Sequence, residues 1–394
     1  IVGTEGAGVD LAKLRAHKEG IVGAMVAAHE KMFAAPGLDF IRGEARFTGE
    51  RTVTIALEDG GERTIRGERV LINLGSRPAR PAIPGLWESG AWTNEEILRL
   101  EELPSSLAII GASYIGVEFA SMMATFGVDV TLISSGDHVL PREDEDAARV
   151  LEDVFERRGV RVMPRSRASA VERTEDGSGV IVTLSDGRKV SGTHCLVAIG
   201  SIPNTEDLGL DAAGVEHAPS GHITVDGVSR TSVNNIYAAG DCTGVYPLAS
   251  VAAMQGRIAM AHILGDAVRP LRTDKVAANI FTSPEIATVG ISENDLHEGS
   301  YRGEAVTLQL STNPRAKMMA MRDGFVKVFA RRHSGTVIGG VVVGQRASEL
   351  IYPIALAVEK KLTVDDLAET FTVYPSLSGS IAEAARKLHT RGKF

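Results

Sequence analysis

The sequence predicts an α/β protein whose C-terminal part is an α+β domain. From Ser105 onward, short buried strand patterns alternate with helix patterns, which is typical of a parallel sheet covered by helices on both faces. From about Asp274, several strand patterns precede a run of helix patterns instead. Because 394 residues are too many for one ordinary core, we expect two or three domains.

The N-terminal part predicts one long helix followed by short strands. Residues 11–35 have helical periodicity, and a Pro-Gly pair ends the helix. Alternating apolar residues then predict strands, with a tight turn at Asp59-Gly60. The proline-rich stretch 76–85 is expected to connect two domains.

The remaining elements follow from the same periodicities. In the middle of the chain we expect strands at 107–110, 128–133, 160–163, 195–199 and 236–239, helices at 115–126, 143–158 and from about 248, and a hairpin at 180–190. In the C-terminal part we expect strands at 287–290, 305–310, 325–330 and 337–343, and helices at 348–360, 364–370 and 380–388.

Composition excludes several classes of function. The net charge is −8 and the basic residues are scattered, which argues against nucleic acid as a partner. No apolar run approaches the roughly 20 residues of a transmembrane segment, and no signal-peptide pattern opens the chain. The two cysteines are far apart and form no CxxC pair, so we expect neither a disulfide framework nor a metal site. A cytoplasmic protein is the resulting expectation.

A strand, a glycine-containing loop and a helix in LAIIGASYIGVEFA predict a dinucleotide site. Gly111 permits the tight turn, and Gly116 lets the helix pack close to the strand. Ser113 replaces the middle glycine, and its small side chain still allows a phosphate to approach. The helix N-terminus then offers N–H groups and a partial positive charge to a pyrophosphate. The alternative is a tight turn that binds nothing.

The end of the next strand bears on the choice between NADH and NADPH. An acidic residue there would read the ribose 2′-OH, but the strand ends in Ser134 and Ser135, and Asp137 lies past its end. No arginine is found at the strand end, and His138 is the nearest possible cation, with Arg142 a further candidate. Both nucleotides stay open, with a slight preference for NADPH.

A second nucleotide footprint is predicted in IYAAGDCTGVYPLASVAAMQGRIA. The strand runs into Gly240 and Asp241, and a helix begins near Leu248. A carboxylate at the end of a strand can accept hydrogen bonds from a polyol hydroxyl, and N–H groups at a helix start stabilise negative charge on a ring carbonyl. Spacing alone does not identify the ligand, and the alternative is that Asp241 is an N-cap and turn residue.

Together these motifs resemble the FAD-containing pyridine nucleotide–disulfide oxidoreductases, the glutathione reductase and lipoamide dehydrogenase superfamily. VLINLGSRP, LVAIGSIPNT and FTSPEIATVG match further segments in the same order. The resemblance implies two nucleotide-binding three-layer (ββα) domains, of which the FAD domain is incomplete, and a C-terminal α+β dimerisation domain. The implied ranges are 1–104 and 231–272 for FAD, 105–230 for NAD(P)H and 273–394 for dimerisation.

The resemblance also implies site residues. FAD is expected at Glu44, Ala45, Gly75, Gly240, Asp241, Leu248, Ala249 and Ser250. NAD(P)H is expected at Gly111, Ser113, Gly116, Ser134, Ser135, His138 and Gly200. Tyr114 matches the aromatic gate over the flavin face, and Glu118 matches a carboxylate that pairs with a lysine beside the flavin.

The sequence departs from the family pattern in two places. The opening FAD βαβ unit, the CxxxxC redox pair and its lysine would precede Ile1, so a fragment of a longer protein is expected. The family segment H-P-T-x-x-E is also changed, because Tyr374 stands at the histidine and Gly379 at the glutamate. A tyrosine pKa near 10, against about 6.5 for histidine, makes a poor proton acceptor. Loss of a positioned acid–base group costs roughly 10²–10⁴ in rate.

These departures predict a quinone reductase in preference to a disulfide reductase. Hydride would pass from NAD(P)H to FAD, and electrons would then reach a quinone that takes protons from solvent. The resemblance is closest to a bacterial NAD(P)H:quinone reductase branch. It implies a homodimer in which Tyr374 lines the acceptor pocket at the flavin of the partner subunit. A dihydrolipoamide dehydrogenase or other disulfide reductase is one alternative, and a non-catalytic nucleotide-binding fragment is another.

Overall fold

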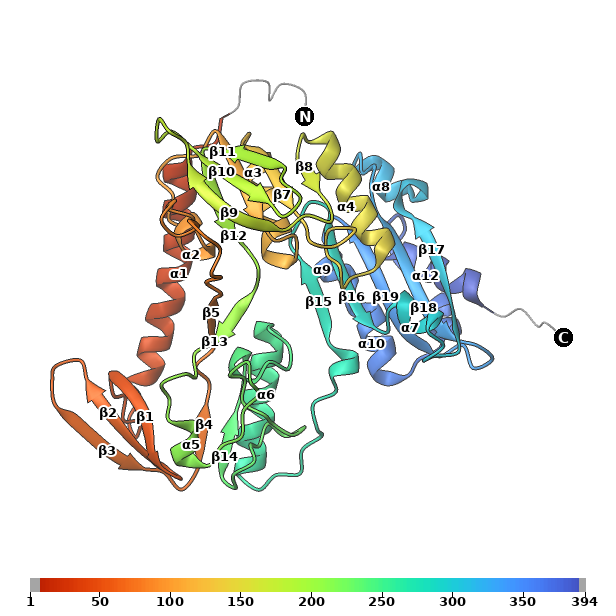
Figure 1. The fold of residues 1–394 in the computed structure, drawn as a ribbon. Coiled ribbons are helices and arrows are strands. Elements are labelled where there is room, and N and C mark those ends of the chain that lie inside the picture. The colour runs from red at the N-terminus through yellow and green to blue at the C-terminus, as the bar shows by residue number, and fades with distance from the viewer. Residues whose placement is uncertain (1–7, 390–394) are drawn as a thin grey trace. The chain divides into compact units, whose positions relative to one another are not determined.

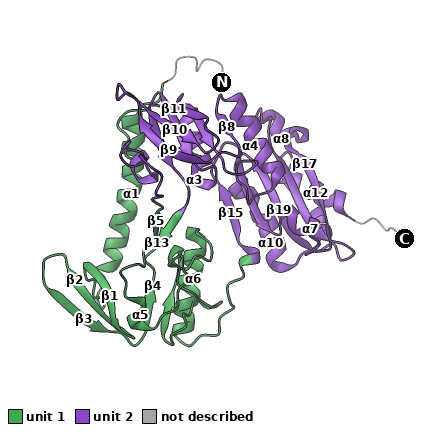
Figure 2. Cartoon of the chain, in the orientation of Figure 1, with its two compact units in different colours: residues 1–79, 98–103, 201–273 green, residues 80–97, 104–200, 274–394 purple. Residues whose placement is uncertain are grey.

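In a computed structural model of the protein, which describes residues 8–389, the chain forms two compact units (Figure 2). One unit comprises residues up to Ala79, residues 98–103 and residues 201–273. The other comprises residues 80–97, residues 104–200 and the chain from Asp274 onward. The second unit thus holds most of the ranges expected for NAD(P)H binding and dimerisation, and the three expected domain boundaries themselves stay predictions.

The first unit contains a three-stranded antiparallel sheet and two two-stranded ladders (Figure 1). Its elements are α1 (Leu11–Phe33), β1 (Gly43–Gly49), β2 (Thr52–Leu57), β3 (Glu62–Arg66), β4 (Val70–Ile72), β5 (Ser76–Pro78), β13 (Ser201–Pro203), α5 (Leu210–Ala213), β14 (Ile236–Ala238), η1 (Asp241–Thr243) and α6 (Ala249–Ile263). Strand β14 pairs in parallel with β4, so two segments far apart in the sequence share one ladder. A core cluster that includes Ile72, Ile236 and Cys242 holds this ladder together.

The first part of the second unit is built on a four-stranded parallel sheet in the order β12-β6-β7-β8. Its elements are α2 (Asn94–Ile97), β6 (Ser106–Ile110), α3 (Tyr114–Thr125), β7 (Asp129–Ile133), α4 (Glu145–Arg157), β8 (Arg161–Met163), β9 (Ala168–Arg173), β10 (Val180–Leu184), β11 (Lys189–Gly192) and β12 (His194–Val197). Helix α4 begins after Asp144, whose side chain accepts a hydrogen bond from the Ala147 N–H. It buries one face at helical spacing, through Ala147, Leu151 and Val154.

The C-terminal part of the second unit is a five-stranded antiparallel sheet in the order β15-β16-β19-β18-β17 (Figure 1). Its elements are β15 (Ala277–Ile280), β16 (Glu285–Gly290), α7 (Glu293–His297), β17 (Gly303–Gln309), η3 (Leu310–Thr312), α8 (Pro314–Met318), β18 (Phe325–Arg331), β19 (Val337–Gly344), α9 (Ala347–Leu350), α10 (Tyr352–Lys360), α11 (Val364–Glu369) and α12 (Gly379–Leu388). Helices α10 and α12 pack against this sheet and share its buried core.

The expected α/β fold with a C-terminal α+β domain is confirmed. One expected element is wrong in detail, because the helix at 348–360 is two helices, α9 and α10. Pro353 lies in the first turn of α10, where its missing N–H removes a bond that a continuous helix would need. The short strands β9 and β15 were not expected. Across residues 8–389, no helix combines the length and the apolar character needed to cross a membrane.

Candidate functional site

The predicted dinucleotide loop between β6 and α3 packs tightly against backbone atoms of the protein itself. Gly111 has a φ of +109°, and a Cβ there would lie 2.3 Å from the carbonyl oxygen of Ala198. A Cβ on Gly116 would lie 1.8 Å from the carbonyl oxygen of Gly111. Both distances are far below van der Waals contact, so the backbone of the protein itself requires glycine at both positions.

The mouth of this loop has the features of an anion site. Ser113 is the N-cap of α3, is exposed, and makes no capping hydrogen bond through its side chain. Amide groups in the first turn of a helix bind phosphates because they lack intrahelical partners. Gly200, with a φ of +113°, follows the neighbouring strand β12 at the same edge of the sheet. Four predicted NAD(P)H residues therefore lie at one sheet edge.

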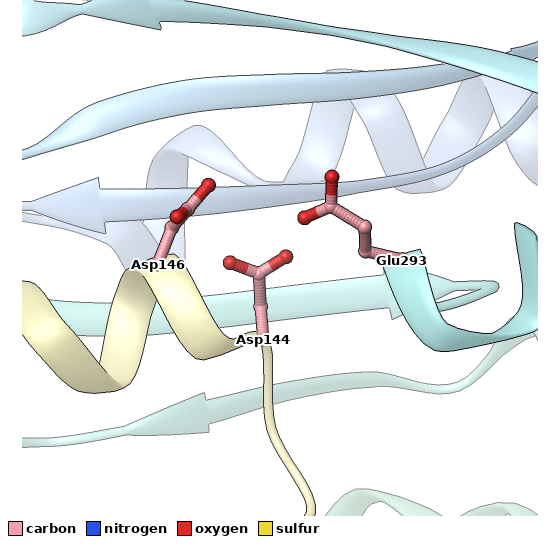
Figure 3. Close-up of side chains that lie close together, drawn as sticks. All are labelled: Asp144, Asp146 and Glu293. Atoms are coloured by element: carbon pink, nitrogen blue, oxygen red, sulfur yellow. The ribbon is translucent and has the colours of Figure 1, made fainter. Parts of the chain in front are cut away.

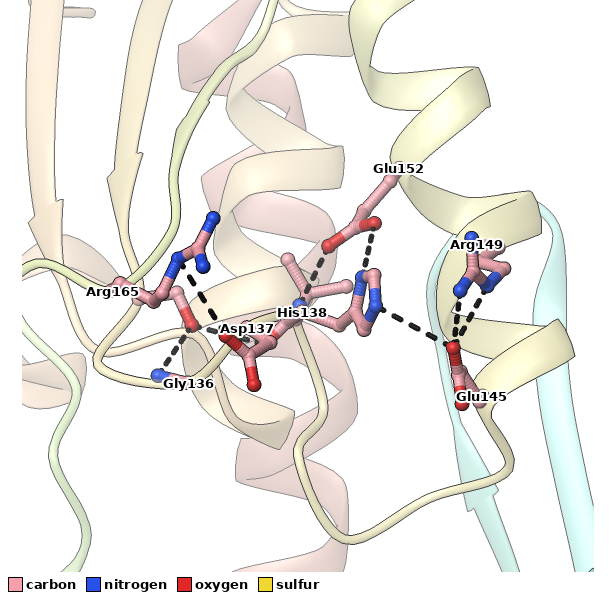
Figure 4. Close-up of polar contacts among 9 residues, drawn as sticks. Gly136, Asp137, His138, Glu145, Arg149, Glu152 and Arg165 are labelled. Carbon is pink, nitrogen blue, oxygen red and sulfur yellow. Dashed lines mark hydrogen bonds and ion pairs between the residues drawn. The ribbon is translucent and has the colours of Figure 1, made fainter.

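Most polar side chains of the loop after β7 are bonded to other groups of the protein. The buried Ser134 hydroxyl donates to the carbonyl oxygen of His138 over 3.0 Å and accepts from the Gly136 N–H. The His138 ring lies 3.0 Å from a carboxylate oxygen of Glu152 and forms a second ion pair with Glu145, so it faces α4 (Figure 4). Ser135 is exposed. Of the residues predicted here, Ser135 is therefore the one whose side chain is presented to solvent.

Tyr114 occupies the first position of α3, directly after the loop. Its side chain is 40% exposed, and its hydroxyl donates to Glu143 Oε1 over 2.7 Å. Burial raises the pKa of Glu143, the hydrogen bond from Tyr114 opposes this rise, and the neighbouring Asp144 adds to it. The contact fixes the phenol beside the loop. Glu143 was not predicted, because nothing in its local sequence distinguishes it from the acidic residues that follow.

Glu118 lies one turn further along α3 and accepts a hydrogen bond from the Phe281 N–H over 2.7 Å. The Ser283 N–H donates to the Ser121 hydroxyl in the same way, so the turn between β15 and β16 is bonded to α3 at two points. Burial raises the pKa of Glu118, and the bond from Phe281 opposes the rise. The lysine that the family resemblance pairs with Glu118 was expected before Ile1, outside the described residues.

A buried lysine joins the two parts of the second unit. Lys327 on β18 is 1% exposed, and its ammonium donates to the carboxylates of Asp144, Asp146 and Glu293. Figure 3 shows these three carboxylates converging from α4 and α7, in an arrangement that by distance alone is able to hold a metal ion. Burial by itself would lower the pKa of Lys327, but these hydrogen bonds raise it above its usual value. We assign the cluster to Lys327, whose ammonium is hydrogen-bonded to all three carboxylates and offsets part of their negative charge.

A cavity lies at the end of the β4–β14 ladder in the first unit. It has a volume of about 490 Å³, and its lining residues are mostly small: Leu71, Asn73, Gly75, Ala239, Gly240, Asp241, Ala252, Ala253 and Gly256. The Asp241 carboxylate accepts a hydrogen bond from the Ser76 hydroxyl over 2.8 Å, and the Gly240 N–H donates to Gln255 Oε1. A Cβ built on Gly75 has no atom within 4 Å. This open cradle fits an extended group such as the ribityl chain of a flavin.

The other residues predicted for FAD do not line this cavity, and they fall into two groups. Leu248 is the N-cap of α6, and Ala249 and Ser250 are exposed in its first turn. Glu44 and Ala45 lie on β1, paired with β2, and do not line the cavity. The structure therefore brings Gly75, Gly240 and Asp241 together, and it places Glu44 and Ala45 on a separate sheet.

The segment around Tyr374 is exposed. The Tyr374 side chain is 82% exposed, and the Gly379 N–H donates to the Ser376 hydroxyl at the start of α12. A Cβ on Gly379 would meet the Ser376 and Thr372 hydroxyls at 3.5 and 3.7 Å, which are ordinary contact distances. The backbone thus has room for a Cβ at residue 379. Packing around the backbone therefore does not explain why residue 379 is a glycine and not a glutamate.

The two cysteines are buried and free. Burial raises the pKa of Cys195 to about 12. Burial also raises the pKa of Cys242, although nearby backbone amides oppose the rise. Since the thiolate is the reactive form, neither residue is suited to disulfide exchange.

Comparison with known proteins agrees with this arrangement. Residues 4–256 match the family model described as pyridine nucleotide-disulphide oxidoreductase, and residues 276–385 match the dimerisation domain of the same family. The chain belongs to the pyridine nucleotide-disulphide oxidoreductase family, whose members are FAD-dependent and use NAD(P)H. The resemblance stated from the sequence is confirmed.

Three relatives illustrate the range of the family. An NAD(P)H dehydrogenase (quinone) of Mycobacterium tuberculosis is 51% identical over 332 residues, which cover 84% of this chain and 66%, just under two thirds, of that protein. A dihydrolipoyl dehydrogenase of Haloferax volcanii is 35% identical over 96% of this chain and 80% of its own length. The crystal structure of LpdA from Mycobacterium tuberculosis is 46% identical, with a TM-score of 0.89 over 96% of this chain and 84% of LpdA.

Proposed function

We propose that the protein passes hydride from NAD(P)H to FAD and then passes electrons to a quinone. The observation that carries the proposal is the exposed segment with Tyr374 and Gly379, in which neither position of the family's proton-transfer pair is kept. The 51% identical relative named NAD(P)H dehydrogenase (quinone) supports the same choice of acceptor.

The donor side of the reaction would use the loop at the start of α3. The pyrophosphate of NAD(P)H would lie against the N–H groups that follow Ser113. Tyr114 would lie beside the nicotinamide, with its ring held by the hydrogen bond to Glu143. Glu118, held by the Phe281 N–H, would keep a fixed carboxylate one turn away. These contacts orient the donor before hydride leaves it.

The flavin side would use the cavity of the first unit. Bound FAD supplies the two-electron chemistry that no side chain provides. Asp241, which accepts a hydrogen bond from the Ser76 hydroxyl, would accept another from a ribityl hydroxyl. The start of α6 at Ala249 and Ser250 would stabilise negative charge on a ring carbonyl.

The acceptor side needs little from the protein. The balance is NAD(P)H, one proton and a quinone on one side, and NAD(P)⁺ and a quinol on the other. Dithiol exchange requires a base that stabilises a thiolate, whereas a quinone at an exposed rim takes its protons from water. Tyr374 would provide an aromatic surface and a hydrogen-bond donor for such a planar acceptor.

We also propose a homodimer. Residues 276–385 match a dimerisation domain. Large apolar side chains are exposed within this range, namely Phe281, Met318, Tyr352, Leu356, Phe371, Val373 and Tyr374. Large apolar side chains that remain exposed are typical of surfaces that contact another protein. In the dimer, Tyr374 would reach the flavin of the partner subunit.

A disulfide reductase is the second candidate, and it is supported by the relatives named dihydrolipoyl dehydrogenase. A nucleotide-binding protein without catalysis is the third. The first two candidates bind a flavin, which absorbs at about 450 nm and is bleached by NADPH or NADH. The third candidate would not show this bleaching.

The deciding experiment is steady-state turnover of the complete polypeptide with NAD(P)H and menadione, compared with its turnover of dihydrolipoamide. We expect menadione turnover to exceed dihydrolipoamide turnover by roughly 10²-fold or more, because the acid–base pair is absent. A Tyr374→Phe variant keeps the ring and is expected to retain menadione turnover. The Tyr374→His, Gly379→Glu double variant is the matched test of the missing pair. Rapid dithiol turnover by the unaltered protein, with menadione ignored, would contradict the proposal.

A further inference from the structure

The segment after β8 brings an arginine to the end of β7. Strands β7 and β8 are parallel neighbours, so the segments that follow them lie at the same edge of the sheet. The Ser166 N–H donates to the carbonyl oxygen of Ser134 over 2.7 Å, and the Arg165 N–H donates to that of Gly136 over 2.8 Å. These two bonds fix the backbone of Arg165 against the loop at which the sequence places an adenosine ribose.

The side chain of Arg165 is exposed to solvent. It is 79% exposed, and its guanidinium lies 3.6 Å from the carboxylate of Asp137, which is itself 75% exposed (Figure 4). An exposed ion pair of this length contributes at most about 1 kcal/mol. The Asp137 pair therefore holds the guanidinium near the loop only weakly. Another anion can replace the Asp137 carboxylate at a small free-energy cost. Arg165 also has a φ of +50°, a left-handed conformation that the two backbone bonds maintain.

Of the other basic groups that follow β7, His138 and Arg149 are engaged by carboxylates, while Arg142 is exposed nine residues past the end of the strand. Figure 4 shows the His138 ring directed at Glu145 and Glu152, on the side of the loop away from Arg165. Arg149 is bonded to Glu145 as well. The cation whose backbone is bonded to the loop after β7 is Arg165, and it comes from the segment that follows the neighbouring strand β8.

We propose that Arg165 binds the 2′-phosphate of NADPH and that Asp137 is the carboxylate this phosphate displaces. The inference rests on the proposed use of NAD(P)H at the Gly111–Gly116 loop and adds the residue that selects between the two donors. A dinucleotide bound at such a loop extends its adenosine ribose past the end of the second strand, where an acid favours NADH and an arginine favours NADPH. The planar guanidinium matches a phosphate in two parallel hydrogen bonds, and the exposed Ser135 hydroxyl lies in the same loop.

The test measures binding of 2′,5′-ADP and of 5′-AMP by titration calorimetry, with the protein in its purified form. These two probes differ by the 2′-phosphate alone, and neither requires hydride transfer. Arg165→Asn is the informative variant, since asparagine tolerates the left-handed backbone and so removes the charge without new strain. We expect it to weaken 2′,5′-ADP binding roughly tenfold or more and to leave 5′-AMP binding unchanged.

Two further variants make the test specific. Arg167→Asn removes an equal charge from an exposed arginine two residues along the chain, and it is expected to leave both affinities within about twofold, as the loss of an exposed charge that does not contact the ligand does. Asp137→Asn removes the competing carboxylate and is expected to strengthen 2′,5′-ADP binding severalfold. Equal affinity of the unaltered protein for the two probes would overturn the proposal, and so would an equal loss of both in Arg165→Asn. Failure of both probes to bind would instead remove the dinucleotide site and, with it, the proposed function.

Discussion

Both nucleotide-type sites have a glycine shortly after the end of a strand, but they require these glycines for different reasons. At the loop between β6 and α3, a Cβ on Gly116 would lie 1.8 Å from a backbone oxygen of the protein itself. At the end of the β4–β14 ladder, a Cβ on Gly75 would meet no atom within 4 Å. The first glycine is required by the protein's own packing, while the second faces open space and is constrained by its φ of +67° alone.

This difference follows from how each site is supported. The first lies on a four-stranded parallel sheet whose helix packs directly onto the strand. Within the described residues, the second lies on a two-stranded parallel ladder beside a cavity of about 490 Å³. The first site is closed by the protein's own backbone, whereas the second is lined mostly by small residues and is open within the described residues.

The largest expected effect comes from Gly116→Ala. Overpacking costs about 1–3 kcal/mol, and occasionally more, even where side chains give way. Here the obstacle is the Gly111 carbonyl oxygen, so we expect a loss of about 3 kcal/mol or more in the free energy of unfolding, together with loss of dinucleotide binding. Urea denaturation followed by far-UV circular dichroism measures the first quantity, and calorimetry measures the second.

A matched control for this change is Gly23→Ala. Gly23 lies within α1, and a Cβ there has no atom within 4 Å. We expect this substitution to stabilise the protein by up to about 1 kcal/mol, because alanine favours a helix more than glycine does. If Gly116→Ala were as harmless as the control, the contrast between a site closed by its own backbone and an open site would be lost.

A smaller effect is expected for Gly75→Ala. The left-handed conformation costs an alanine roughly 1–2 kcal/mol, and there is no clash to add to it. The methyl group would instead intrude on the cradle that the flavin is proposed to fill. We expect a larger loss of bound flavin, measured by absorbance after gel filtration, than the modest loss of stability suggests. A variant that lost stability but kept its flavin fully would show that the open space has another use.

The smallest effect concerns pH and Glu118, which belongs to the first site. Its pKa is raised from 4.5, mainly by burial. An acid whose folded pKa exceeds its unfolded pKa favours folding in its protonated form, so its contribution to stability is lost as pH rises from 4.5 through the folded pKa. Glu118→Gln keeps an oxygen to accept the Phe281 N–H bond and does not ionise. We expect the variant and the unaltered protein to have similar thermal midpoints below pH 4.5, and the variant to gain toward neutral pH. A constant difference across that range would contradict the burial argument.

Much of the fold was predictable because local patterns dictate it. The helix expected at 11–35 is α1 (Leu11–Phe33), and the expected parallel strands and the helices α3 and α4 are present within a few residues of their expected bounds. Errors came where one residue outweighed the pattern. Pro353 divides the helix expected at 348–360, although the apolar periodicity runs through it.

The site was predictable only in part. Glycine loops and an acid at a strand end can be read along the chain, and they led to Gly111, Gly116 and Asp241. Arg165 was missed because a cation was sought along β7 itself, and strand pairing supplies it from β8. Lys327 was missed for a similar reason, since a lysine inside a strand pattern predicts a solvent-facing side chain, and its three carboxylate partners come from two other helical segments.

By itself, the sequence determined the family, the order of the motifs and the replacement of the family's histidine and glutamate by Tyr374 and Gly379. These features depend on the identity and spacing of neighbouring residues, which the chain carries wherever it folds. The tertiary structure alone decided which charges meet. A carboxylate or a guanidinium acquires its partner through strands and helices that pack from distant parts of the chain, and the energy of such a pair depends on distance and burial, which no one-dimensional pattern contains.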